Sequence, residues 1–244
     1  MTKTFLLSII FSMSLVKNNA YCQSAEQTFS VLINLTKGND FKKIFKSIDS
    51  LAKNDLVSNK YFQLYIDREI DLNVVHKRIE LSMNSSSFQL DFLMRNDSIL
   101  LKAVKGGKKS LLSYTYDTSQ ISIFVEERNK LFGAKKSISD LKRELLISES
   151  FAMYCGEVMA LTSEGSKILA MVNDEDVDKF RRMTQSFSPE IQAYGIAGLE
   201  MLKRNNFEMS DYDNWVIQYI RKRNAEVISC SGCFTIVSKI YSMN

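Results

Sequence analysis

The chain has a single proline and only nine glycines in 244 residues. So few turn-forming residues argue against a long disordered linker and against a β-sandwich rich in turns. Histidine is equally scarce, since His76 is the only one. A Ser-His-Asp arrangement therefore has one possible base, and no Gly-x-Ser-x-Gly motif supports it. We interpret His76 as an ordinary surface residue on the polar side of a helix.

Charge of one sign is not in excess either. The 32 lysines and arginines nearly balance the 28 aspartates and glutamates, for a formal net charge of +4. Because this excess is small and dispersed, we expect no binding to nucleic acid. No helix signal follows the glycines of the basic stretch 102–109, so we interpret it as a solvated turn rather than a phosphate loop. The acidic run at 174–178 lacks the glycine and spacing of a calcium loop, and no cofactor is indicated.

Residues 1–20 have the three parts of a secretory signal. A basic Lys3 precedes the apolar run Phe5–Val16, and the polar residues 17–20 follow it. The apolar run is too short to span a hydrocarbon core of about 30 Å, and no later run is long enough. We therefore expect no transmembrane segment, removal of residues 1–20, and a mature protein that is secreted or periplasmic.

Cys22, just beyond the expected cleavage site, is a candidate for lipid attachment. Lipidation of this residue would anchor the protein there. Bacterial lipoprotein signals place a small residue before the cysteine, whereas Tyr21 is bulky. We therefore favour cleavage without anchoring.

The spacing of apolar residues predicts an α+β fold that is mainly α. Residues 41–52 and 59–79 carry apolar side chains three and four positions apart, which indicates two helices, although the start of the second segment is also compatible with a strand. We divide the mature chain into a region of helices and sheet, residues 21–136, and a helical region, residues 137–244. The two regions form either two domains or one.

The period changes to two between these helical regions. From Phe88 to Met94 the even positions are large and apolar, the turn residues Asn96-Asp97 follow, and the alternation then resumes. Further strands are expected at 111–116 and 121–125. We therefore predict a small antiparallel β-meander over about residues 87–125, with one face covered by the flanking helices.

Everything after Ser137 is expected to be helical. The apolar residues from Ile138 to Met159 fall close to a single stripe, compatible with one long helix. Ser188-Pro189-Glu190 supplies an N-cap, a proline at the first helical position and an early acid, which together start a helix. The spacing of Ser210 and Asp213 is that of a capping box, and predicts the start of another.

Residues 188–199 resemble the first helix of a HEAT repeat, with a polar-Pro start, an aliphatic residue and small residues before a leucine. Gly195 and Gly198 would let a neighbouring helix approach closely, a packing reason for glycines that each cost helix propensity of about 1 kcal/mol. The resemblance covers residues 174–223, at most about one and a half repeats where a solenoid needs about three. Gln192 stands where the family has an arginine. The resemblance implies a stacked-helix module with a protein-binding surface.

The most specific chemical feature is Cys230-Ser231-Gly232-Cys233. We favour a structural disulfide, because export to an oxidising compartment permits one; either cysteine could join it, with the other one or Cys155 as partner. If Cys22 is lost with the signal, one of the three remaining thiols stays free. In a redox site the motif stands at the start of a helix, whereas here it follows one. A zinc site would need Cys155, both cysteines of the motif and His76. Among these four residues, only Cys230 and Cys233 have the spacing of zinc ligands.

No complete catalytic set is present, and we expect a protein that is not an enzyme. The leading hypothesis is an exported protein-binding module, with an inhibitor or immunity-type role as one concrete version. The alternative is a thiol-disulfide oxidoreductase that uses Cys230 and Cys233.

Overall fold

The computed structural model describes residues 24–54, 61–83, 86–106, 111–146, 150–231 and 234–240. The expected signal, Cys22 and Cys233 lie outside this part of the chain. The described residues contain eight helices and a five-stranded antiparallel sheet, with about half of the chain helical and 30% in strands. The fold is thus an α+β mixture in which the sheet is far larger than expected, so the prediction of a mainly α fold with a small meander is wrong.

The chain divides into two compact units, and the division runs through the sheet. Unit 1 holds the chain up to Tyr65, Arg78–Phe92 and Asp97–Tyr116. Unit 2 holds Ile66–Lys77, Leu93–Asn96 and everything from Asp117. The turn ends of two hairpins of the sheet therefore group with the C-terminal part of the chain.

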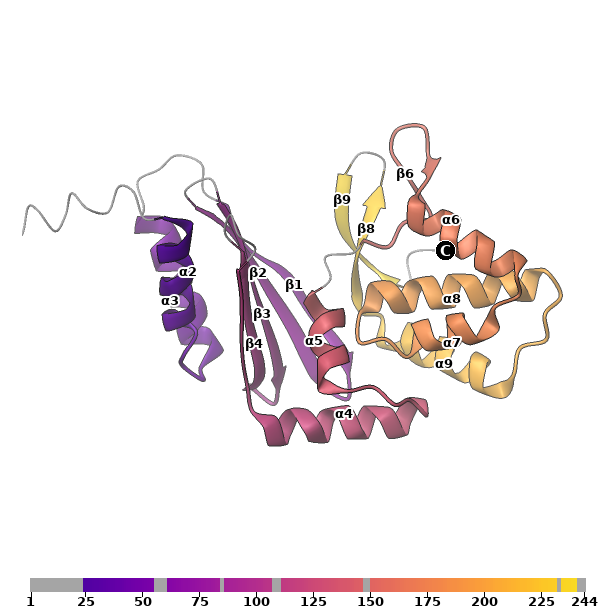
Figure 1. The fold of residues 1–244 in the computed structure, drawn as a ribbon, viewed down its shortest axis with the longest axis horizontal. Helices are drawn as coiled ribbons and strands as arrows, with labels where there is room; N and C mark the ends of the chain where they lie inside the picture. Colours follow the sequence, from indigo (N-terminus) through magenta and orange to yellow (C-terminus); the bar gives the residue numbers. More distant parts are fainter. Residues whose placement is uncertain are drawn as a thin grey trace, which may run out of the picture. The chain divides into compact units, whose positions relative to one another are not determined.

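Sequence neighbours are also neighbours in the sheet, whose strand order is β1-β2-β3-β4-β5 (Figure 1). The strands are β1 (Tyr61–Asp71), β2 (Val74–Met83), β3 (Ser86–Arg95), β4 (Ser98–Gly106) and β5 (Leu111–Tyr116). The strands predicted around Phe88–Met94 and after Asn96-Asp97 are present as β3 and β4, but β4 is buried at every position from Leu100 to Val104, so the expected alternation with one covered face is wrong there. In unit 1, helices α2 (Ala25–Leu35) and α3 (Phe41–Asn54) accompany the strands, and the rings of Phe41 and Phe92 meet edge-to-face at 5.1 Å.

The helix expected over residues 59–79 is wrong, because this segment forms the β1–β2 hairpin. Leu72 and Asn73 both have positive φ, 53° and 60°, which is the backbone of a two-residue hairpin turn. The apolar side chains that matched one helix face belong instead to two strands of one sheet. His76 lies in β2 with none of its surface exposed, so its expected place on a helix surface is also wrong.

The strand expected at 121–125 is wrong as well, since these residues lie inside helix α4 (Thr118–Phe132). The Asp117 side chain accepts hydrogen bonds from the main-chain N–H groups of Ser119 and Gln120 and so begins this helix. The polar residues 117–119, which separate the two expected strands in the sequence, therefore form the start of a helix.

Unit 2 combines helices with two small hairpins. The helices after α4 are α5 (Ile138–Leu146), α6 (Ser163–Asn173), α7 (Val177–Thr184), α8 (Pro189–Arg204) and α9 (Asp211–Arg223). The hairpins are β6 (Tyr154–Cys155) with β7 (Ala160–Leu161), and β8 (Glu226–Ser231) with β9 (Phe234–Lys239). The long helix expected from Ile138 to Met159 is thus wrong, because β6 lies within this segment, and the C-terminal region is not clearly a helical repeat.

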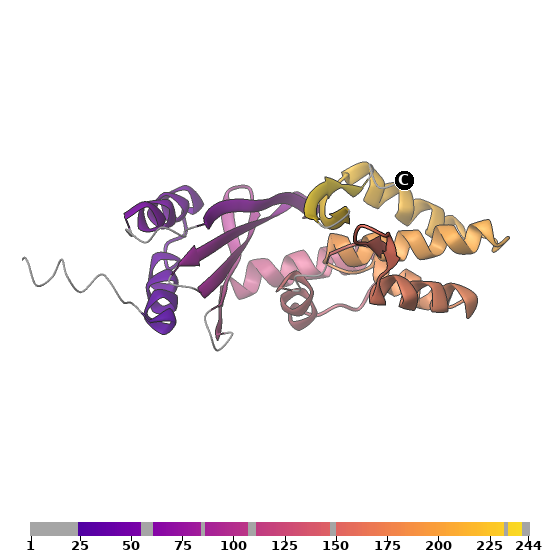
Figure 2. The ribbon, with the colours of Figure 1, turned by 90° about the horizontal axis from the view of Figure 1, so that it is seen from above.

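Two predicted helix starts are confirmed. Ser188 caps α8 with Pro189 in its first turn, and Ser210 forms a capping box with Asp213 at the start of α9. The helices α6 to α9 lie side by side in both views (Figures 1 and 2). A Cβ atom placed on Gly198 would overlap the Phe180 ring of α7, so the expected close approach of a neighbouring helix is present.

The core of unit 2 lies between these helices and the β8–β9 hairpin. Its buried apolar members include Phe132, Ile168, Phe180, Leu199, Val216, Ile220 and Val227. One strand residue, Val227, is part of this helical core, so the hairpin is packed onto the body of the unit and is positioned by it.

Candidate functional site

A disulfide joins the two hairpins of unit 2. Cys155 of β6 is bonded to Cys230 of β8, with their Cα atoms 5.7 Å apart and 75 positions apart in sequence. This pairing is one of the alternatives that the sequence left open. Closing a loop of this length stabilises a fold by about 4 kcal/mol in the chain-entropy account. The two hairpins are therefore held together covalently as well as by packing.

The same two hairpins expose large apolar side chains. Val158 and Met159, at the turn of the first hairpin, are 86% and 60% exposed, and Phe234, at the start of β9, is 74% exposed. The residues of this kind on both hairpins, here called the hairpin surface, are Tyr154, Val158, Met159, Leu161, Phe234, Ile236 and Val237. Single exposed apolar residues are common, whereas a group of them marks an interaction site or an aggregation hazard.

A shallow apolar groove lies beside the base of β9. Its lining comes from Phe151, Ala193, Ile196, Ala197, Glu200, Arg221 and Ile240. Glu200 and Arg221 form an ion pair across it with N and O atoms 2.8 Å apart. Ile240 follows β9 directly in the sequence, and none of the residues of the hairpin surface lines the groove.

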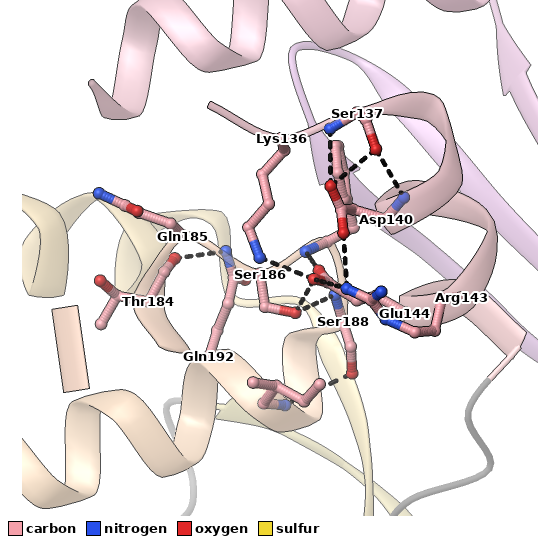
Figure 3. Close-up of polar contacts among 12 residues, drawn as sticks. Lys136, Ser137, Asp140, Arg143, Glu144, Thr184, Gln185, Ser186, Ser188 and Gln192 are labelled. Atoms are coloured by element: carbon pink, nitrogen blue, oxygen red, sulfur yellow. Dashed lines mark hydrogen bonds and ion pairs between the residues drawn. The ribbon is translucent and has the colours of Figure 1, made fainter. Parts of the chain in front are cut away.

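Behind the hairpins, the loop between α7 and α8 is the centre of a buried polar network (Figure 3). One carboxylate oxygen of Glu144, Oε2, accepts hydrogen bonds from the Ser186 hydroxyl and the Phe187 N–H, each at 2.7 Å. The other oxygen, Oε1, accepts from Lys136 Nζ at 2.7 Å. Ser186 is only 1% exposed. A serine this enclosed has no room for a substrate, so we interpret the Ser186–Glu144 pair as structural.

The network continues to β8 through Glu190. Ser188 Oγ donates to Glu190 Oε2 at 2.8 Å, and the Ile228 N–H donates to Glu190 Oε1 at 3.0 Å. Burial opposes ionisation of Glu190, but the charge of Arg68 and these hydrogen bonds outweigh it and hold its pKa below the ordinary value. This carboxylate therefore binds the first turn of α8 to the outer edge of β8.

Asp71 is a second buried carboxylate, placed by the turn end of the β1–β2 hairpin. Arg128 Nε lies 2.5 Å from one of its oxygens and an Arg223 nitrogen 2.6 Å from the other. Arg128 also donates to the carbonyls of Gln185 and Ser186. Burial, with Asp71 nearby, raises the pKa of Tyr219 to about 12. The side chains of Asp71, Arg128 and Arg223 are nearly fully buried, so we interpret this frame of paired charges as structural.

The residues singled out in the sequence are only partly brought together. Cys155 and Cys230 meet in the disulfide, Cys233 is not described, and His76 is buried in β2. Within the described ranges, no group of three or more His, Cys, Asp or Glu side chains is arranged to hold a metal ion. The zinc alternative thus finds no support in this part of the chain.

Sequence reasoning missed the hairpin surface altogether. The sequence predicts a helix up to Met159 where the β6–β7 hairpin lies, and only the cysteines of the segment 226–239 stand out. The signal that could have found it is the pair of β-rich stretches on either side of Gly232 in the sequence, namely Val227-Ile228 and Phe234–Val237. Comparison with protein-family models, curated proteins and solved structures gave no match.

Proposed function

We propose that the protein is exported and acts by binding another protein through the hairpin surface. The observation that carries this proposal is that seven exposed apolar side chains gather on two hairpins joined by a disulfide. Exposed apolar residues cost solubility, and a group of this kind is typical of a protein–protein contact.

The frame behind the hairpins supports a binding role. Glu190 holds β8 from one side and the disulfide holds it to β6, so the surface is preformed and little order has to be gained on binding. An inhibitor or immunity-type role would use such a rigid surface.

Export is supported by the signal-like residues 1–20 and by the disulfide, which forms and persists in oxidising compartments. None of the described helices is long and apolar enough to cross a bilayer.

The oxidoreductase alternative has less support. Cys230 is bonded to Cys155, and it lies in a strand rather than in the first turn of a helix, where the macrodipole lowers a thiol pKa. The arrangement around Cys230 resembles a structural crosslink.

A competition crosslinking experiment tests the proposal. A photo-reactive residue is placed at Val158 or at Phe234, and the protein is exposed to material from its export compartment. We expect a crosslinked product that excess unlabelled protein removes and that excess Val158→Asp/Phe234→Asp protein does not remove. The matched control carries the photo-reactive residue at Ile123 of α4, which is 44% exposed and lies in the same unit. Equal products from Ile123 and from the hairpins, or competition by both unlabelled proteins, would contradict the proposal.

A further inference from the structure

We propose that β9 pairs with β9 of a second copy of this chain, which joins the two β8–β9 hairpins into one four-stranded antiparallel sheet. The proposal concerns the main chain of β9, and so goes beyond the binding of a partner by the apolar side chains of the hairpins.

The register of the hairpin shows which main-chain groups of β9 point outward. Ser231 pairs with Phe234, Ser229 with Ile236 and Val227 with Ser238. In a hairpin with a two-residue turn the closing pair is hydrogen-bonded, and hydrogen-bonded pairs then alternate along the ladder. The N–H and C=O groups of Thr235 and Val237 therefore point away from β8.

The hydrogen bonds at the opposite edge of the hairpin confirm this assignment of outward-pointing groups. On β8 the residues that should point outward include Glu226 and Ile228. The carbonyl of Glu226 accepts from Arg68, the Ile228 N–H donates to Glu190, and the Ile228 carbonyl accepts from the Phe151 N–H. The outer edge of β8 is thus occupied by its own unit.

Within the described ranges, the outer edge of β9 has no such partners. Among the described residues, the outward N–H and C=O groups of Thr235 and Val237 form no hydrogen bond. Both residues are exposed, Val237 at 36%. Water hydrates these exposed groups one at a time, whereas another extended backbone offers donors and acceptors at the same spacing as the whole edge.

Natural edge strands are usually protected against pairing by charges, proline or a bulge. From Phe234 to Ser238 this strand has no charge and no proline. The first charge is Lys239, whose Nζ lies 3.4 Å from a carboxylate oxygen of Glu226 in its own chain. An uncharged edge is compatible with a copy of itself, since pairing brings no like charges together.

A two-fold axis at Ile236 satisfies the outward groups. In this register Thr235 of each copy pairs with Val237 of the other copy, which forms about four main-chain hydrogen bonds. Ile236 lies opposite its counterpart in a non-hydrogen-bonded pair, where side chains are closest. The contact is isologous and closes as a dimer. A second copy is the occupant we infer because its strand matches this edge in length, charge and apolar character.

The edge is also held in place before any contact forms. Val227 of β8 is packed in the core, and Ser229 and Ser238 are hydrogen-bonded across the hairpin at 2.9 Å. The disulfide adds a covalent link from β8 to β6. The turn residues Val158 and Met159 belong to the other hairpin, so the paired strands do not include them.

Sedimentation velocity of the purified, disulfide-intact protein between about 1 and 300 µM tests the proposal. We expect a concentration-dependent dimer for the wild type and for Val237→Thr, which keeps the N–H and the branched shape. Val237→Pro removes only an outward N–H, a change that edge strands tolerate, and we expect its dimerisation to weaken at least tenfold. A wild type that stays monomeric, or equal dimerisation of Val237→Pro and Val237→Thr, would overturn the proposal.

A charge pair tests the register without changing the main chain. Ile236→Lys and Ile236→Glu should each be monomeric, because two like charges would face each other across the axis. An equimolar mixture of the two variants should recover the dimer. Dimerisation of either variant alone at the wild-type level would overturn this register, and circular dichroism with an intact disulfide checks that each variant is folded.

Discussion

Arg68 and Glu190 form a buried, bidentate ion pair across 122 positions of sequence, with N–O distances of 2.5 and 3.1 Å. Their side chains are only 3% and 2% exposed. The same carboxylate binds the N–H of Ile228 in β8. The hairpin that carries β9 is therefore positioned by a charge pair and not only by its apolar packing.

Removal of one partner of this pair should be strongly destabilising. Glu190→Ala leaves the Arg68 charge buried without its counterion, and we expect a loss of about 3–5 kcal/mol in the free energy of unfolding. The control is the double variant Arg68→Met/Glu190→Leu, which removes both charges of the pair and should cost clearly less. Urea unfolding measures both, and equal losses would contradict an ion-pair role.

The pair should also make stability depend on pH. The pKa of Glu190 lies below its ordinary value of 4.5, so the folded state favours the carboxylate. Its stabilising contribution is complete above about pH 4.5 and is lost as pH falls through the lower, folded-state pKa. The difference in unfolding free energy between wild type and Glu190→Gln should be largest at neutral pH and should shrink in acid. A difference that stays constant from pH 7 to pH 3 would count against this assignment.

The disulfide should be directly observable. A non-reducing peptide map should contain one crosslinked species joining the Cys155 peptide to the Cys230 peptide, which separates under reduction. The double variant Cys155→Ser/Cys230→Ser should be less stable by about 4 kcal/mol, because the unfolded chain regains its freedom. Crosslinks from Cys230 to Cys233 instead would show that the hairpins are not joined in this way.

The packing of α7 on α8 predicts a steric effect. Gly198→Ala gains about 1 kcal/mol of helix propensity, yet its Cβ would overlap the Phe180 ring. We expect a net destabilisation of about 1–3 kcal/mol, as for other overpacked cores. In a Phe180→Leu background the same substitution should cost less, and a double-mutant cycle measures the difference. A cost that is unchanged in that background would mean that the ring is not the obstacle.

Much of the candidate site was not predictable from local pattern. Asp71, Arg68 and Arg223 look like ordinary solvated charges in sequence, and only chain segments that are far apart bury and pair them. The residues of the β1–β2 hairpin carry apolar spacings that suit a helix as well as two strands. The positive φ angles of Leu72 and Asn73 form the tight turn that makes this segment a hairpin instead of a helix. The surrounding fold makes that turn favourable.

The sequence by itself determined the features that depend on near neighbours. The caps at Ser188 and Ser210 start α8 and α9 because their hydroxyl groups reach N–H groups within one turn. The alternation in β3 needs only the period of a strand. The tertiary structure alone decided that Cys230 bonds to Cys155 and that Glu190 is buried against Arg68. It also decided that the two hairpins carrying exposed apolar residues are joined, because these outcomes depend on which distant segments pack together.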